Sequence, residues 1–546
     1  MKKAVFPLLA AFIALCAVDS LAQPMGRGRG GMARGGNVNY DYLLSSPTTM
    51  ENADERFQAV SNWAFSLREK GVHLREVFDQ NDMMRIRGLL QSDRAMAVKE
   101  IDASIKRLAG VAGVSTPAGP GLGQSAMGRQ YPTAPVTLSI PYPYAGYYIM
   151  PLVNDPADGA IMAGLNRGIL TVTLHGSPAI VTQDPLEKSK DPALRNQSFG
   201  FLADDLDAAT RHTPELNFGW VKLSGLKGAN WSVYLHGAPG METGEAYLES
   251  IRRNAEKAAQ AGLNVLLIIE PMQEKKRTKV ATSIDMKTRR VAFQDHQSEE
   301  YTNFLRKLFA KLPMVKYYSL GNEADNYMAA EDYARALKVT YDTLKESCPA
   351  CSLVTSGYLN DNGAAYFEQA LAALKGKRAF DHFDMRHVFG YYGEYRRIKE
   401  EYRAARNMLD RYGYRDAEIW MTETASPSAM SGDPNTSDAA QAADVVRRYV
   451  TAYAAGVKKV FWAAVTDHYM FGGRHGFFDS AGIIHNPAND GRADLKPAYH
   501  TYALMARTLA GANLATAERV EVGPSAECYR VMKDGKPFYF MWPTVR

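Results

Sequence analysis

Apolar residues along this chain change their spacing several times, and each change predicts a different kind of secondary structure. Between residues 49 and 110 they recur every three or four positions, which is typical of amphipathic helices. Residues 111–134 form a linker rich in glycine, proline and serine. Residues 135–190 then hold short apolar runs between turn residues, a pattern that predicts β-strands.

Strand-like and helical runs alternate from residue 199 to residue 510. We place the strands at 199–203, 220–224, 265–270, 317–322, 353–356, 382–388, 418–422 and 460–465, with amphipathic helices between them. Alternation of this kind predicts a parallel sheet, and eight such units over about 310 residues predict a (β/α)8 TIM barrel. The expected fold class is therefore α/β.

Short strands return in residues 511–546, where Asp534 and Gly535 form the turn of a hairpin. Neither these strands nor those of residues 135–190 are numerous enough to close a sandwich, because each set alone leaves edges and one apolar face uncovered. We therefore expect the two sets to pair into one accessory β-sandwich, built from strands before and after the barrel.

The first 22 residues predict a secretory signal peptide. Lys2 and Lys3 precede an apolar stretch that ends in Ser20-Leu21-Ala22, a cleavage site with small residues at its two key positions. We expect the mature protein to be secreted or periplasmic and to begin with a disordered Gly/Arg-rich segment over residues 23–48. No later run of about 18 apolar residues predicts a membrane helix. The formal net charge of +5 includes no basic stripe of the kind that binds nucleic acid.

Three cysteines remain once the signal peptide is removed: Cys348, Cys351 and Cys528. In an exported protein the Cys-Pro-Ala-Cys spacing predicts a local disulfide between the first two. No second pair of cysteines or histidines completes a zinc set, so we expect no metal and no other cofactor. Cys528 is expected to be a buried free thiol.

Two glutamates at the ends of predicted strands are the main candidates for chemistry. Glu323 ends the fourth strand and Glu423 ends the seventh. A TIM barrel carries its catalytic groups at the carboxyl ends of its strands, and glycoside hydrolysis needs two carboxyl groups. One of them must be protonated to release the leaving group, and the other must be ionised. The alternative for each residue is a surface acid at a helix start.

Three short motifs lie at the ends of strands four, seven and eight: Gly321-Asn322-Glu323, Thr422-Glu423 and Phe461-Trp462. In this order they resemble the retaining glycoside hydrolases of clan A, most like family 39, over residues 199–510. The resemblance implies that Glu323 is the general acid/base and Glu423 the nucleophile. Two carboxyl groups about 5–5.5 Å apart predict retention of the anomeric configuration.

The same resemblance implies sugar contacts for neighbouring residues. Asn322 would hydrogen-bond the sugar 2-hydroxyl, although it is also a suitable N-cap. Trp462 would form the floor of the subsite that holds the attacked sugar, the alternative being an ordinary core tryptophan. His387 or Tyr391, after strand six, would keep Glu423 ionised, whereas a lone histidine often has a purely structural role.

Weaker candidates for substrate contacts are polar residues near other predicted strand ends: Asp204, Asp205, Asp207, Lys222, Glu270, Asp467 and His468. The aspartates do not form a calcium loop, because the twelve-residue spacing and its closing glutamate are absent. Lys222, with Arg211 and His212, leaves an acidic sugar open as a substrate.

The domain order departs from that of family 39, whose members usually carry the side sandwich after the barrel. Here the closing strands of such a sandwich precede the barrel, so the chain resembles a circular permutation of that arrangement. We interpret the sequence as an exported retaining glycoside hydrolase that cleaves β-glycosidic bonds of a polysaccharide or oligosaccharide. The alternatives are a non-catalytic carbohydrate-binding protein and an accessory factor for exopolysaccharide assembly.

Overall fold

The computed structural model describes residues 48–49, 53, 56–57, 60, 86, 89, 94–112, 135–153, 160–183, 195–237, 241–271, 298–359, 363–390, 393–429, 436–468, 477–490 and 492–544. The predicted signal peptide, most of the Gly/Arg-rich segment and residues 113–134 of the linker lie outside this set. The chain divides into two compact units, one of residues 29–128 and one of residues 1–28 together with 129–546.

In the smaller unit the longest described element is the helix α5 (Arg94–Ala112). It agrees with the helical periodicity of residues 49–110 over the part that it covers. Its apolar face is buried, with Ile101 and Leu108 fully inaccessible to solvent. The backbone N–H of Thr48 donates to Asp102 on this helix, which ties a distant part of the unit to α5.

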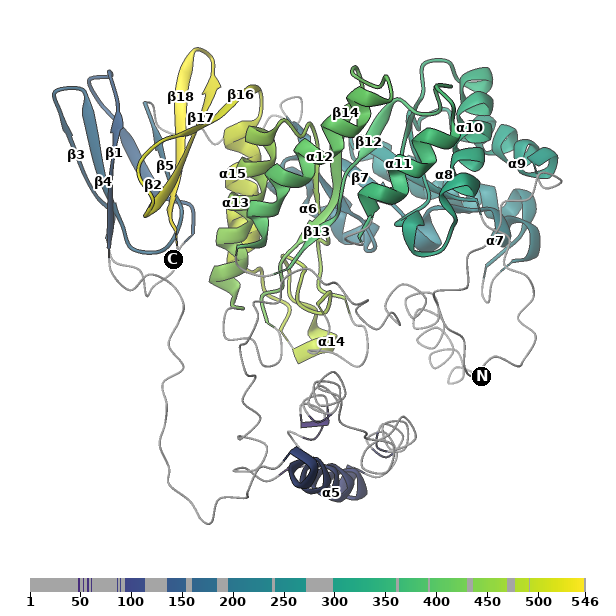
Figure 1. Cartoon of the computed structure of the whole chain (residues 1–546), viewed down its shortest axis with the longest axis horizontal. Coiled ribbons are helices and arrows are strands. Elements are labelled where there is room, and N and C mark those ends of the chain that lie inside the picture. The colour runs from purple at the N-terminus through teal and green to yellow at the C-terminus, as the bar shows by residue number, and fades with distance from the viewer. Residues whose placement is uncertain are drawn as a thin grey trace. The chain divides into compact units, whose positions relative to one another are not determined.

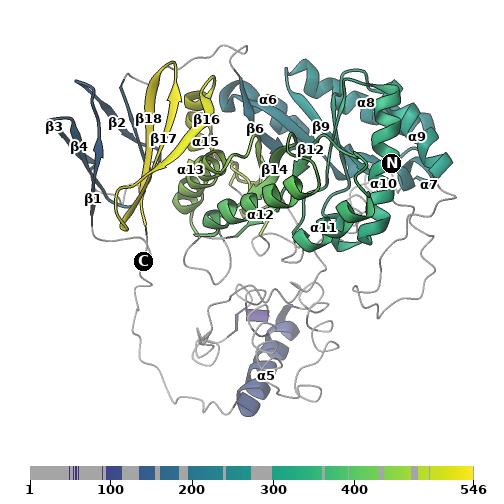
Figure 2. The same ribbon diagram turned by 45° about the horizontal axis from the view of Figure 1, so that its top comes forward.

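The larger unit contains a closed barrel of eight parallel strands (Figures 1 and 2). In barrel order these are β6 (Asn196–Leu202), β7 (Phe218–Leu223), β9 (Asn264–Glu270), β10 (Tyr317–Leu320), β11 (Ser352–Val354), β12 (His382–Asp384), β14 (Glu418–Ala425) and β15 (Val460–Trp462). Parallel pairing of β15 with β6 closes the ring. All eight predicted strands are therefore confirmed, and the short strands β8 (Ala229–Asn230) and β13 (Val388–Phe389) extend the sheet locally.

Helices connect the strands and cover the outside of the barrel (Figure 1). The principal ones are α6 (Leu206–Leu216), α8 (Gly244–Gln260), α9 (Ser298–Lys311), α10 (Ala330–Ser347), α11 (Gly363–Ala373), α12 (Arg397–Arg411), α13 (Asp438–Ala455) and α15 (Pro497–Leu509). Shorter helical turns are η2 (Gly225–Lys227), α7 (Trp231–His236), η5 (Ala324–Asn326), η6 (Glu394–Arg396) and α14 (Pro487–Asp490). The helices expected from the periodicity of the sequence are present.

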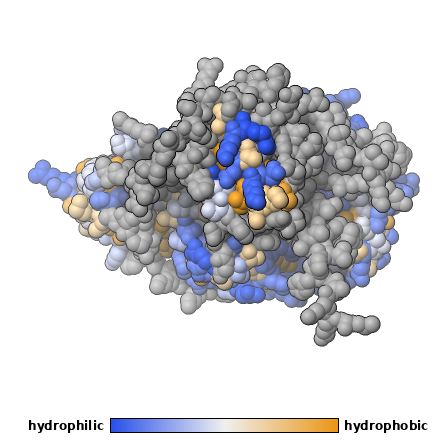
Figure 3. All heavy atoms as spheres, turned by 90° about the horizontal axis from the view of Figure 1, so that it is seen from below, coloured by the Kyte–Doolittle hydropathy of each residue, from blue (hydrophilic) through white to orange (hydrophobic). Residues whose placement is uncertain are grey.

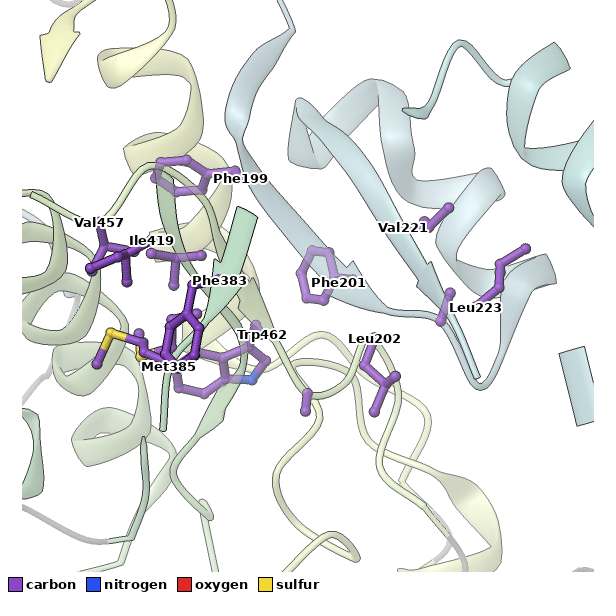
Figure 4. Close-up of a cluster of buried hydrophobic side chains, with 14 of the residues drawn as sticks. Phe199, Phe201, Leu202, Val221, Leu223, Phe383, Met385, Ile419, Val457 and Trp462 are labelled. Atoms are coloured by element: carbon purple, nitrogen blue, oxygen red, sulfur yellow. The ribbon is translucent and has the colours of Figure 1, made fainter. Parts of the chain in front are cut away.

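Two apolar layers hold the barrel together. One cluster brings together Trp220, Trp420 and Phe461 from three barrel strands. At Gly200 a Cβ atom would lie 2.6 Å from the Phe461 ring, so only glycine fits there. A larger cluster fills the space between strands and helices (Figure 4). In this cluster Phe199 packs on Tyr449 of α13, with ring centroids 4.3 Å apart.

The accessory sandwich is made from strands on both sides of the barrel in sequence, as predicted. One sheet has the order β1 (Val136–Pro141), β4 (Ile169–Leu174), β3 (Met162–Asn166). The other has the order β16 (Asn513–Val520), β17 (Ala526–Lys533), β18 (Lys536–Pro543), β5 (Ala179–Thr182), β2 (Tyr148–Pro151). The antiparallel pairing of β18 with β5 joins the two halves of the chain. Leu138, Val172, Val181 and Met541 share the buried core of this sandwich.

The sandwich is bonded to the barrel by buried polar contacts. Tyr395, after strand six, donates its hydroxyl proton to Glu527 of β17 at 2.7 Å. Trp542 of β18 donates its indole N–H back to the Tyr395 oxygen at 3.2 Å. In the part of the sandwich that precedes the barrel in sequence, the carbonyl of Leu152, just after β2, accepts a hydrogen bond from Thr501 of α15 at 2.7 Å. Both sets of sandwich strands therefore contact the barrel.

The cysteines behave as expected. Cys348 and Cys351 form a disulfide between α10 and β11. Cys528 is a buried free thiol in the sandwich core, and burial raises its pKa to about 12.

No helix in the described ranges is both long enough and apolar enough to cross a membrane. Figure 3 shows hydrophilic and hydrophobic residues intermingled on the described part of one face. The large apolar side chains exposed among the described residues come from different elements: Met96, Tyr148, Met162, Ile169 and Leu495.

Candidate active site

Glu323 and Glu423 meet at the carboxyl ends of strands four and seven. Glu323 directly precedes η5 and has a left-handed backbone with φ 52°. Glu423 lies near the carboxyl end of β14. Both are buried, with 8% and 6% of their surface exposed. One carboxylate oxygen of each lies within 4.8 Å of the other, so the barrel brings together the two predicted carboxyl groups.

His387 stands between the two glutamates. Its Nδ1 lies 2.9 Å from Glu423 Oε2 and 3.1 Å from Glu323 Oε1, and its Nε2 lies 3.2 Å from Asp384 Oδ2. Burial would lower the pKa of this imidazole, but the charges of Glu423 and Asp384 raise it well above its ordinary value. A doubly protonated His387 can donate to Asp384 on one side and to the glutamates on the other.

A chain of buried hydrogen bonds continues from Asp384 to strand two. Thr422 donates its backbone N–H to Asp384 Oδ1 at 2.9 Å and its hydroxyl to the same carboxylate. Lys222 of β7, itself buried, donates from Nζ to Thr422 Oγ1 at 2.9 Å and to Asn322 Oδ1 at 3.1 Å. Asn322, beside Glu323, is thus held by a lysine from β7, a strand separated from β10 only by β9.

These neighbours keep Glu423 ionised. Burial alone would raise the pKa of its carboxyl group, but the charges of Lys222 and His387 and the hydrogen bond from His387 outweigh burial and lower the pKa to about 2. An ionised carboxylate is what a nucleophile needs, so the electrostatics of the site suit Glu423 for that role.

Glu270 ends β9 and has a different environment. Burial raises the pKa of its carboxyl group to about 7, and the hydrogen bond from Tyr327 opposes this only in part. Tyr327 donates its hydroxyl proton to Glu270 Oε2 at 3.1 Å. The mouth of the barrel therefore holds, besides the ionised Glu423, a carboxyl group whose pKa is raised to near neutral pH.

Other predicted site residues have structural partners. Asp205 caps α6, because its Oδ1 accepts from the backbone N–H of Ala208 at 2.9 Å. Trp462 lies among the buried apolar side chains of Figure 4 and is 0% exposed. Its indole N–H donates to the carbonyl of Ala481 at 2.8 Å. Sugar contacts by Asp205, Trp462, Asn322 and Glu270 stay predictions. Tyr391 lies outside the described residues.

Sequence reasoning missed two residues that shape this network, Asp384 and Gly357. Asp384 lies three residues before His387, a spacing that could have indicated the pair. Gly357, after strand five, gave no signal: a Cβ atom there would lie 1.9 Å from His387 Nε2 and 2.8 Å from Asp384 Oδ2. The absence of a side chain at Gly357 is what leaves room for the imidazole.

Glu323, His387 and Glu423 also have the spacing of a metal-binding set, with one ligand atom from each within 4.8 Å. A metal would need a lone pair on His387 Nδ1, which the proton shared with the glutamates occupies. The raised pKa of His387 therefore makes a proton compete with any cation at this position.

Comparison with known proteins gives similarity at the level of structure. The sequence matches no protein-family model and no curated protein sequence. The structure is similar to a family 39 glycoside hydrolase from the gut symbiont Bacteroides cellulosilyticus WH2, with 16% identity and a TM-score of 0.51. That alignment covers 75% of this chain and 84% of the other.

Two further solved structures give lower scores. A family 39 β-xylosidase from Caulobacter crescentus has 14% identity and a TM-score of 0.42, and the alignment covers 63% of this chain and 79% of that one. A GH5_18 protein from Streptomyces cattleya, in complex with GlcNAc, has 16% identity and a TM-score of 0.40, covering 57% of this chain and 80% of that one. The strand order and the first of these alignments show that the chain has a TIM-barrel fold similar to that of clan A glycoside hydrolases.

Proposed function

We propose that this protein is an exported retaining glycoside hydrolase that cleaves β-glycosidic bonds of a polysaccharide or oligosaccharide by double displacement. The observation that carries the proposal is the close pair of buried carboxyl groups, Glu323 and Glu423, at the mouth of a barrel with a glycosidase-like fold. Export rests on the sequence of the first 22 residues alone.

The first step forms a covalent intermediate. The carboxylate of Glu423 attacks the anomeric carbon while the protonated carboxyl group of Glu323 gives its proton to the departing oxygen. In the second step the Glu323 carboxylate takes a proton from water, and the resulting nucleophile attacks the anomeric carbon and releases Glu423. The spacing of the two carboxyl groups supports retention, because inverting enzymes separate them by about 6.5–9.5 Å to admit a water.

His387 is within hydrogen-bond distance of whichever glutamate is negatively charged in each of the two steps. In the free enzyme its Nδ1 is closer to Glu423 than to Glu323. When Glu423 becomes a neutral ester, the remaining negative charge is on Glu323, which the same nitrogen also reaches. We therefore assign His387 a positioning role for both carboxyl groups.

The test is the hydrolysis of aryl β-glycosides by Glu423→Ala and Glu323→Ala. The first variant should lose nearly all activity, and azide should rescue it with inverted product. The second should retain activity on good leaving groups and lose it on poor ones, because only poor leaving groups need a proton. Glu418→Gln is a matched control, since Glu418 lies at the other end of the same strand with a side chain 42% exposed.

Proton NMR of the first sugar released by the parent enzyme reports the anomeric outcome. Product with the β configuration supports double displacement, whereas initial α product contradicts it. Wild-type rates in both glutamate variants, on a substrate that the parent cleaves, would refute the assignment of the site.

A further inference from the structure

A pair of charged residues, Asp204 and His468, lies beside Glu423 without a part in the two displacement steps. Asp204 follows β6 and His468 follows β15, and these strands are neighbours in the barrel, with β14 next to β15. Loops after neighbouring parallel strands meet at the same edge, so both residues stand at the mouth next to the nucleophile. His468 Nε2 lies 2.8 Å from Asp204 Oδ2.

The charges of the pair reach Glu423. His468 is among the groups that lower the pKa of Glu423, and Glu423 in turn raises that of Asp204. Burial raises the pKa of Asp204 further, but the ion pair with His468 and the charge of Lys227 outweigh both effects, so this pKa is lower than usual. Asp204 is therefore ionised at neutral pH, like the nucleophile beside it.

His468 is held firmly in place. Its backbone N–H donates to the carbonyl of Phe478 at 3.0 Å, and its own carbonyl accepts from Asn489 at 2.8 Å. The imidazole stacks on the Phe478 ring at 5.7 Å. A fixed imidazole fixes Asp204 in turn, yet the side chain of Asp204 stays 40% exposed. A carboxylate that is oriented, ionised and open to solvent is suited to accept hydrogen bonds from a ligand.

We propose that Asp204 binds hydroxyl groups of the sugar that Glu423 attacks, with His468 as its positioning residue, and that this carboxylate selects neutral sugars over uronic acids. The inference rests on the proposed glycosidase function and names its substrate class. Sugar hydroxyl groups donate well to a carboxylate, whereas a second carboxylate in the same place would be repelled by Asp204 and by Glu423.

The nearby cations already have hydrogen-bond or ion-pair partners within the protein. Among the described residues around the pair, Lys222 is buried and bonded to neutral oxygens of the barrel, and Lys227 donates to the backbone carbonyl of Asp204. His468 is engaged by Asp204 itself. Arg211 and His212, which left an acidic sugar open from the sequence, lie on α6, where His212 contacts Tyr499 at 3.0 Å.

The experiment compares aryl β-glycosides with one leaving group and different sugars: xyloside, glucoside, galactoside, mannoside, glucuronide and galacturonide. The parent enzyme should prefer a neutral sugar. Asp204→Ala should lower kcat/KM on that sugar roughly 10- to 100-fold, the usual effect of losing hydrogen bonds to a charged group. Asp204→Asn should lose less and should raise the ratio of uronide to neutral turnover, because the repelling charge is gone.

Two further arms separate contact from structure. If Asp204 touches the sugar, a deoxy analogue lacking the bound hydroxyl should be hydrolysed equally by parent and Asp204→Ala. His468→Gln, which keeps a donor, should retain more activity than His468→Phe. Asp416→Asn is the control for charge, since Asp416 lies before β14 at the opposite end of the barrel with a side chain 64% exposed.

The outcomes distinguish the two proposals. An active parent whose Asp204 variants keep wild-type kcat/KM on every substrate overturns this inference alone. A parent that prefers a uronide overturns the selectivity and leaves the glycosidase function standing. A parent inactive on all of the glycosides overturns the proposed function, and this inference with it.

Discussion

Replacing Lys222 by methionine tests whether a buried cation keeps the nucleophile ionised. Lys222 is the first of the charges that lower the pKa of Glu423, and it also donates to Asn322 and Thr422. Methionine has nearly the same length and no charge. The substitution therefore removes the positive charge and two hydrogen bonds while it keeps most of the packing.

The expected shift follows from the pKa itself. A fall from 4.5 to about 2 corresponds to about 3 kcal/mol in favour of the ionised form. Lys222 shares this effect with His387, so its loss should raise the pKa of Glu423 by about one unit or more. Because Glu423 must be ionised to attack, the acidic limb of kcat/KM should move to higher pH by the same amount.

Stability should change in the same window. A carboxyl group with a depressed pKa in the folded state stabilises the fold above pH 4.5, and this contribution is lost as pH falls toward 2. Lys222→Met should therefore be less stable than the parent at neutral pH and should lose less on acidification. Urea unfolding at several pH values measures the difference.

The assay is kcat/KM against pH with an aryl glycoside that the parent cleaves. Lys222→Arg retains the charge and should keep the acidic limb of the parent. Thr422→Ala removes two hydrogen bonds but no cation, so it should shift the acidic limb only slightly. If Lys222→Met is folded and the acidic limb of its kcat/KM profile lies at the same pH as that of the parent, the charge of Lys222 does not set the ionisation of Glu423.

Further predictions concern the supports of the site. Gly357→Ala should abolish most activity, because its Cβ displaces His387, whereas Gly146→Ala, with nothing within 4 Å, should be neutral; steady-state rates decide. The pKa of Glu270 is raised to about 7, so this carboxyl group lowers the stability of the fold as pH rises from about 4.5 to 7. In Glu270→Gln the urea concentration at the unfolding midpoint should therefore depend less on pH over this range. Reducing the disulfide between α10 and β11 should lower the free energy of unfolding by about 2 kcal/mol, measured by urea titration with and without reductant.

The barrel was predictable because its signals are local. Each strand is a short apolar run with a turn residue after it, and each helix shows its own periodicity. Glu323 and Glu423 could be placed at the mouth because strand ends converge there whatever the loops do. Pairing of the outer strands also followed from a physical requirement, namely that two incomplete sheets must cover each other.

The contacts inside the mouth were not predictable in the same way. Lys222 and Asn322 are 100 residues apart in sequence, and their meeting depends on the radius and shear of the barrel. Trp462 has the position expected for a sugar platform, yet neighbouring residues cover its ring completely. A strand end fixes where a residue lies but leaves open what covers its side chain.

The sandwich has a consequence for how this chain reaches its folded state. Tyr539 on the last strand donates to the carbonyl of Pro141 across 398 residues of sequence. During synthesis the first sandwich strands therefore emerge long before their partners, with unpaired edges and an uncovered apolar face. Contacts of such high sequence separation close slowly, so the sandwich is expected to be the last part to assemble. Shielding of residues 135–190 in the interval, by a chaperone or by the growing barrel, is what a productive folding route of this chain requires.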